Sequence, residues 1–149
     1  MAAEFRVTLA PPQHGWLEVS LRSDEQELVI PASYTPYDSL TELAGALVAL
    51  LEWQSNGIAR FNCEPDGYDL RFARGASDDR TLVHAVHFPF DRRRPASQTI
   101  VLSYEGSTMQ VGRCFWRAFR RLKMTFDRTH WSYDFPSKLV ARLGALTRS

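Results

Sequence analysis

Residues 39–57, SLTELAGALVALLEWQSNG, decide the fold class because they predict a helix between segments that alternate like strands. Ser39 and Glu42 have the spacing of a capping box, in which each side chain bonds a backbone N–H at the helix start. Asn56 and Gly57 supply a left-handed C-terminal stop. The apolar residues fall on one helical face: Leu40, Leu43, Ala44, Leu47, Leu50 and Leu51.

The back of this helix is also poor in polar residues, since it carries Gly45, Ala46, Ala49 and Trp53. A helix that is apolar nearly all round is usually covered on two sides. Two interpretations stay open for the second side. Either another helix of the same chain covers it, or the same helix of a second copy does so in a homodimer.

Segments of alternating apolar and polar residues predict strands on both sides of this helix. The run 81–88 is apolar on both faces, so we expect it at the centre of a sheet. Pro31 is expected to end the third strand. Short turns between the segments favour antiparallel pairing. The expected strands are 5–9, 17–21, 27–30, 59–63, 68–72, 81–88 and 99–104.

The C-terminal part predicts two further helices. Ser107 and Gln110 form a second capping box, and Pro136 fits the first turn of the last helix. We therefore predict one α+β domain over residues 1–149, an antiparallel sheet of about six to seven strands packed against about three helices. The apolar face of the longer helix is Val111, Cys114, Phe115, Ala118, Phe119 and Leu122, and that of the shorter is Phe135, Leu139, Leu143 and Leu146.

Charge is divided unevenly along the chain, although the net charge is only +1. Residues 1–105 contain 9 Lys and Arg and 15 Asp and Glu, whereas residues 106–149 contain 9 and 2. Either the two parts neutralise each other in the fold, or one presents a charged face to a partner. On a partner surface, the guanidinium groups would be exposed, with few carboxylates of the same chain within contact. The candidate partner-binding residues share one arc of the longer helix: Arg113, Arg117, Arg120, Arg121 and Trp116.

Such an arginine row fits three roles: a solvated face, a surface for an acidic protein, or a grip on nucleic acid. The chain as a whole is not basic enough for a typical nucleic-acid binder, so we favour protein over nucleic acid as a partner. The cluster Arg92, Arg93 and Arg94 would extend the positive patch if the fold placed it nearby.

The sequence contains no recognisable catalytic, nucleotide-binding or metal-binding motif. Cys63 and Cys114 lie on apolar stripes with no Cys or His at ligand spacing, so we expect two reduced, packed thiols. His84 and His87 are three apart on an expected strand and point to opposite faces, so they cannot ligate one ion together. We expect neither a metal nor a cofactor.

Aromatic residues cluster late in the chain, where His130, Trp131 and Tyr133 stand between Phe126 and Phe135. One interpretation is a pocket built from His130, Trp131 and Tyr133 together with Trp116, as in an enzyme or small-ligand binder. The other is that the cluster packs the connection between the last two helices.

Cellular location is predicted from two absences in the sequence. No apolar run approaches the ~20 residues of a membrane span. The N-terminal residues lack the basic and apolar regions of a signal peptide. We therefore expect a cytoplasmic protein.

Several landmarks follow one another in a familiar order. Ser33-Tyr34 leads to Asp38-Ser39-Leu40 and the Leu- and Ala-rich helix, and a hairpin follows at 64–72. Trp131, Phe135-Pro136 and a short amphipathic helix complete the series. In this order the chain resembles small bacterial cytoplasmic proteins of the polymorphic-toxin immunity type. The resemblance implies a non-catalytic module that neutralises a toxin by direct binding, and it carries no catalytic residues.

Overall fold

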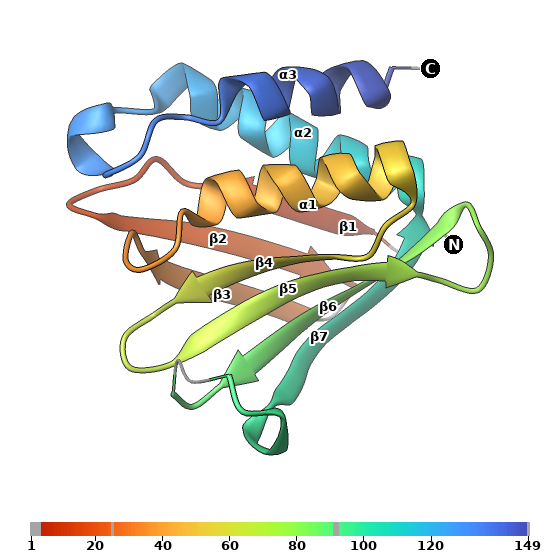
Figure 1. The fold of residues 1–149 in the computed structure, drawn as a ribbon, viewed down its shortest axis with the longest axis horizontal. Helices are drawn as coiled ribbons and strands as arrows, with labels where there is room; N and C mark the ends of the chain where they lie inside the picture. Colours follow the sequence, from red (N-terminus) through yellow and green to blue (C-terminus); the bar gives the residue numbers. More distant parts are fainter. Residues whose placement is uncertain (1–3, 25, 91–92, 149) are drawn as a thin grey trace.

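The structure is a computed structural model that describes residues 4–24, 26–90 and 93–148. Within these residues, one antiparallel sheet of seven strands carries three helices on one side, which confirms the predicted α+β class (Figure 1). The strands are β1 (Phe5–Leu9), β2 (Trp16–Ser23), β3 (Gln26–Ser33), β4 (Gly57–Asn62), β5 (Gly67–Arg74), β6 (Arg80–Phe88) and β7 (Thr99–Ser107). The helices are α1 (Ser39–Trp53), α2 (Thr108–Thr125) and α3 (Ser137–Leu146), with short 3-10 turns at Pro95–Ser97 and Arg128–His130.

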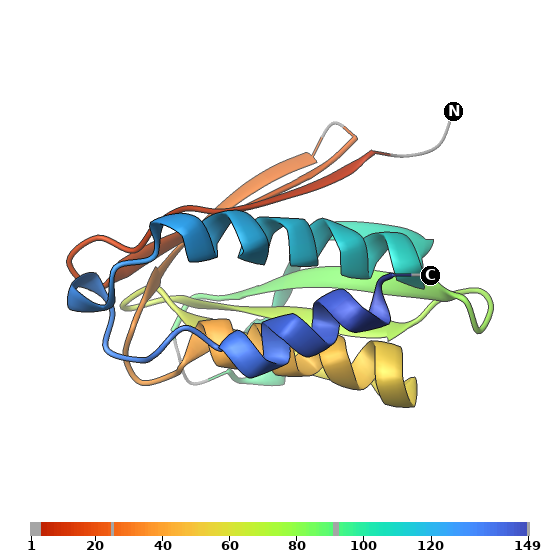
Figure 2. The ribbon, with the colours of Figure 1, turned by 90° about the horizontal axis from the view of Figure 1, so that it is seen from above.

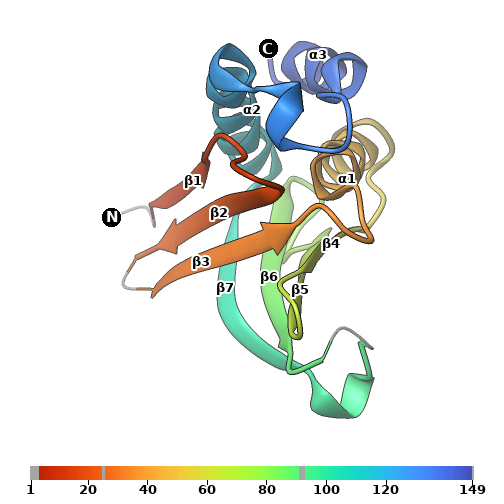
Figure 3. The ribbon, with the colours of Figure 1, turned by 90° about the vertical axis from the view of Figure 1, so that its left-hand side faces the viewer.

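The strands follow one another in chain order across the sheet, yet the sheet is bent into two parts. β3 and β4 are paired only at Ser33 and Asn62, so β1–β3 diverge from β4–β7 (Figure 3). At its other end β3 approaches β7, where the Ser103 N–H donates to Oε1 of Gln26 at 3.3 Å. β6 lies between β5 and β7, in the interior position predicted for the run 81–88.

The third strand continues through Pro31 to Ser33, so the expectation that Pro31 ends it is wrong. Pro31 lies opposite Glu18 of β2, whose carbonyl accepts a hydrogen bond from Ala10 N–H on the β1 side. Because the backbone of Glu18 is directed toward β1, no N–H is needed from the residue opposite it on β3. A proline is tolerated at such a position.

Helix α1 begins with Asp38 as its N-cap, so the predicted capping box of Ser39 and Glu42 is wrong. The Asp38 carboxylate accepts from the backbone N–H of Thr41 at 3.3 Å and from its hydroxyl at 2.7 Å. Ser39 and Glu42 instead bind β4: the Ser39 hydroxyl donates to the carbonyl of Arg60, and the Glu42 carboxylate accepts from the Arg60 guanidinium. The residues predicted as a cap thus dock α1 on the sheet.

The end of α1 also differs from the prediction. Gln54 adopts the left-handed conformation that terminates the helix, with φ of 54°, in place of Asn56 and Gly57. Gly57 opens β4 and passes so close to α1 that a Cβ on it would lie 2.8 Å from Cβ of Ala46. The glycine therefore permits a close approach of strand to helix.

The chain itself covers both sides of α1, because β4 packs on one side and α3 on the other (Figure 2). Gly45 faces Leu139 of α3, and the Glu52 carboxylate accepts from Arg142 of α3 at 2.6 Å. Trp53 is the member of the predicted seam that stays open, with 72% of its surface exposed. A homodimer through α1 stays a prediction. Because β4 and α3 cover much of this helix, the surface left for a second copy lies at its C-terminal end, around Trp53.

Helix α2 fills the space between the two parts of the sheet. Ser107 caps it by accepting from Gln110 N–H at 3.3 Å, which confirms Ser107 as the cap. Phe115 lies at its centre, with ring centroids 5.9 Å from Phe5 of β1 and 5.4 Å from Phe72 of β5. Both parts of the sheet and the helix therefore share one core.

Candidate functional site

Helix α2 presents three exposed arginines, Arg117, Arg120 and Arg121, on the side away from its buried face. In the part of the chain that the structure describes, none of them forms an ion pair with a carboxylate. The guanidinium of Arg120 stacks over Trp116, with Cζ 4.9 Å from the ring centroid. We call these four residues the arginine surface. Its three arginines are exposed and, among the described residues, form no ion pair with a carboxylate, as expected of a partner surface.

Arg113, the fourth predicted member of the row, has a structural role instead. It is half-buried, and its Nε donates to the carbonyl of Thr147 at 3.0 Å. This contact fixes the end of α3 on the first part of α2. The row identified from helical periodicity therefore divides between Arg113, which joins two helices, and the exposed arginine surface.

Among the described residues, one ion pair joins the acidic first part of the chain to the basic last part, and it involves α3. Arg142 forms a bidentate pair with Glu52 of α1, which lowers the pKa of Glu52 and raises the pKa of Arg142 through their hydrogen bonds. Arg128 pairs with Asp134, which lies in the basic tail itself. The acidic strands therefore do not neutralise the arginine surface.

A groove runs beside the arginine surface, between β1 and α2. Its volume is about 380 Å³. At one end the Cys114 thiol donates to the carbonyl of Phe5 at 3.3 Å, which ties helix to strand. We call it the β1 groove, and it is lined by Phe5, Arg6, Val7, Thr8, Cys114, Arg117, Ala118 and Arg121. Sequence reasoning missed it, because its walls are about a hundred residues apart and no local pattern joins them.

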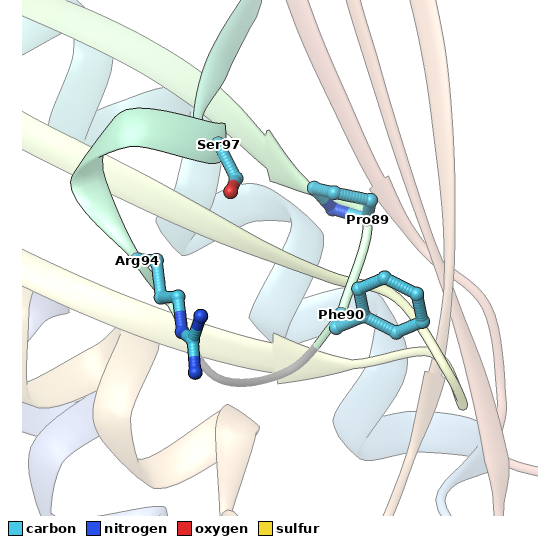
Figure 4. Close-up of a pocket in the computed structure, with 4 residues that line it drawn as sticks. All are labelled: Pro89, Phe90, Arg94 and Ser97. Atoms are coloured by element: carbon cyan, nitrogen blue, oxygen red, sulfur yellow. The ribbon is translucent and has the colours of Figure 1, made fainter.

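The arginine cluster of the β6–β7 connection does not extend this surface. Figures 1 and 3 show that connection at the end of the molecule opposite α2. Arg93 is turned inward to Asp69, and Arg92 lies outside the described residues. Arg94 lines a separate hollow of about 430 Å³ together with Pro89, Phe90 and Ser97 (Figure 4).

The predicted aromatic and histidine pocket is assembled only in part. His130 and Trp131 line an open hollow of about 700 Å³ with His14 and Tyr34. Nδ1 of His130 accepts from the His14 backbone N–H at 3.2 Å, and the two rings meet edge to face. Tyr133 is not among the residues that line this hollow.

The other members of the aromatic cluster pack the structure. Trp116 lies on α2 against Gly144 of α3, away from the hollow. Phe135 contacts Phe119 and Phe126, at centroid distances of 6.3 Å and 5.5 Å. The interpretation that aromatic residues pack the connection between the last two helices is confirmed for these phenylalanines.

His84 and His87 point to opposite faces of β6, as predicted. His84 is paired with Arg71 of β5, whereas His87 stacks on Tyr68 and lies 2.9 Å from a carboxylate oxygen of Asp66. Within residues 4–24, 26–90 and 93–148, no three His, Cys, Asp or Glu side chains are grouped as a metal site.

Both cysteines carry free thiols. Burial raises the pKa of Cys63 from an ordinary value near 9 to about 12, with a smaller contribution from Asp66. Burial also raises the pKa of Cys114, although nearby Arg117 opposes the shift. Because the thiolate is the nucleophile, both thiols are held in their unreactive form.

We expect iodoacetamide at pH 8.5 to alkylate Cys63 much more slowly in the native chain than in the denatured chain, as peptide mass spectrometry would measure. The pKa shift also has a consequence for stability. An unfolded thiol ionises near pH 9 and the native one near 12, so stability falls as the pH rises through this interval. Equal alkylation of native and denatured chains would show that Cys63 is not shielded.

Among the described residues, no helix combines the length and the apolar character needed to cross a bilayer. Comparison of the chain with protein-family models, with curated proteins and with solved structures finds no match. The geometry described above is therefore the basis for a functional proposal.

Proposed function

We propose that this protein is a non-catalytic, cytoplasmic binding module that takes an acidic partner protein on the arginine surface of α2. The observation that carries the proposal is the exposure of Arg117, Arg120 and Arg121 without carboxylate partners in the described part of the chain. Exposed charges of one sign steer an oppositely charged partner and speed its association. The helix that carries them is anchored in the core through Phe115, Phe119 and Leu122, so the three charges project from one packed element.

The resemblance to immunity proteins suggests what such a partner is. A toxin neutralised by direct binding would meet the arginine surface with its own acidic groups. Nucleic acid is the rival partner, since exposed arginines beside Trp116 also suit phosphates and bases. The hollow at His130 and Trp131 is the rival site, which would suit a small ligand.

The double substitution Arg117→Glu and Arg120→Glu tests the proposal. Fluorescence anisotropy with labelled poly-L-glutamate, as a model acidic polypeptide, should show binding roughly tenfold weaker or more, because like charges then meet. The salt dependence of binding should flatten as well. The melting temperature should stay nearly unchanged, since exposed charges contribute about 0–1 kcal/mol each.

A charge-matched control is the double substitution Arg74→Glu and Lys138→Glu, at exposed positions outside the arginine surface. It should retain most of the binding. If both variants lost affinity equally, the change in net charge alone would explain the loss, which would contradict a defined binding site on α2. Tighter binding of single-stranded DNA than of poly-L-glutamate would favour the nucleic-acid partner. Destabilisation by several kcal/mol would show that the arginines are paired inside the fold.

A further inference from the structure

β1 is the terminal strand of the sheet, and β2 is its sole neighbouring strand among the described residues. The Glu4 carbonyl accepts from Asp24 N–H, and the Ala10 N–H donates to the Glu18 carbonyl. Backbone groups alternate sides along a strand, so residues 4, 6, 8 and 10 bond β2. The backbone N–H and C=O of Val7 and Leu9 therefore point to the open edge, where Val7 lines the β1 groove.

The opposite edge of the sheet, by contrast, is partly covered. On β7 the Ser103 N–H donates to Gln26 of β3, and Tyr104 stacks on Phe5 of β1 with ring centroids 4.5 Å apart. Unpaired strand edges are templates for another strand, and proteins commonly cover them. On β1 the Phe5 carbonyl is taken by the Cys114 thiol of α2, whereas Val7, two residues farther along the strand, lines the β1 groove. An added strand would therefore find a groove at this edge of the sheet.

We infer that an extended acidic segment of the partner adds to the edge of β1 as a further strand, with its carboxylates on Arg117 and Arg121. Main-chain hydrogen bonds to Val7 and Leu9 would give the affinity, and the two arginines would select the charge. The inference rests on the proposed function and names how the partner binds.

The spacing of the two arginines fits this occupant. Four residues of helix advance about 6 Å, and alternate residues of a strand are about 6.6 Å apart. Side chains on one face of an added strand therefore match Arg117 and Arg121, one turn apart on α2. Figure 2 shows α2 running alongside β1, and both arginines line the β1 groove. Carboxylates at alternate positions would satisfy two cations that the described chain leaves without carboxylate partners.

The probe is a labelled heptapeptide, Thr-Glu-Thr-Glu-Thr-Glu-Thr, with two analogues of identical charge. One is N-methylated at each of the three Glu residues and the other at the three Thr residues that follow a Glu, so that each loses alternate N–H donors. In an antiparallel addition the residues facing α2 also direct their N–H toward β1, whereas in a parallel addition their neighbours do so. We expect one analogue, and not the other, to bind about tenfold more weakly, as one or two lost hydrogen bonds imply.

Two readouts on the protein complete the test. Amide hydrogen exchange at Val7 and Leu9 should slow when the unmodified peptide is bound. Val7→Pro removes an N–H that points away from β2, so it should weaken peptide binding, and circular dichroism should show that the fold is kept. If the Val7→Pro variant fails to fold, the N-methylated peptides still test strand addition, because they are added to the unchanged protein.

The outcomes separate this inference from the proposed function. Binding that is lost in the Arg117→Glu and Arg120→Glu variant and impaired by one N-methylated analogue supports both. Binding that depends on the arginines but is equal for all three peptides overturns strand addition and leaves the proposed function standing. Absence of peptide binding while poly-L-glutamate still binds overturns strand addition alone, and absence of binding for both probes overturns both proposals. A dimer in light scattering with amides 7 and 9 already protected would make a second copy the occupant and overturn the inference.

Discussion

Replacement of Asp69 by alanine is expected to lower the free energy of unfolding by about 3–5 kcal/mol, because it removes a buried carboxylate that pairs with a nearly buried arginine. The Asp69 side chain is 6% exposed and that of Arg93 15% exposed. The Asp69 carboxylate accepts from Nε of Arg93 at 2.8 Å and from Arg71 at 3.3 Å. Arg93 further donates to the carbonyls of Phe61 and Tyr68.

Arg93 thus joins the β6–β7 connection to β4 and β5, and the Asp69 carboxylate offsets the cost of burying its guanidinium group. Urea denaturation of the purified protein measures the effect. The control is Asp78→Ala, because Asp78 pairs with Arg74 at the exposed surface and should contribute about 1 kcal/mol or less. A loss no greater for Asp69→Ala than for Asp78→Ala would mean that Arg93 does not depend on this carboxylate.

Phe115→Ala should destabilise the protein by about 3–5 kcal/mol, because it opens a cavity where three elements meet. Phe115 is fully buried and contacts Phe5 of β1 and Phe72 of β5. The cavity would lie between the two parts of the sheet, where β3 and β4 share a single paired position.

Thermal denaturation followed by circular dichroism checks this prediction. Met124→Ala serves as the control on the same helix, since Met124 is 83% exposed and its truncation should change stability by about 0.5 kcal/mol or less. A small effect of Phe115→Ala would show that the packing of α2 on the sheet is not what joins the two parts.

Periodicity predicted the elements well, because each element buries one face against a common core. The alternation at Leu17, Val19 and Leu21 and the stripe around Phe115 and Phe119 are both fully buried. The order of strands, helices and sheet class followed from these patterns. Errors fell at the ends of elements, where one side chain with several local partners decides the boundary.

The cap of α1 illustrates such an error. Three side chains near the helix start carry oxygen acceptors: Asp38, Ser39 and Glu42. The sequence alone does not show which of them caps the helix and which bond to β4. In the structure Ser39 and Glu42 form hydrogen bonds with Arg60 of β4, about twenty positions away in the sequence. Tertiary contacts of this kind are invisible to local propensity.

Part of the candidate site was predictable, because the spacing of residues along a helix determines which of them share a face. Helical spacing placed Arg117, Arg120 and Arg121 on one exposed face without knowledge of the fold. It also included Arg113, because periodicity cannot show that the end of α3 meets that position. The β1 groove required the tertiary structure, since strand and helix come together only through the packing of α2 on β1.

The central claim, that the arginine surface binds an acidic polypeptide, is tested most directly by NMR of the isotope-labelled protein. Arginine Nε–H and backbone amide signals would be followed during titration with poly-L-glutamate. We expect the largest shifts at Arg117, Arg120 and Arg121, with little change at His14 and His130. Shifts centred on the hollow at His130, or spread evenly over all exposed arginines, would contradict it.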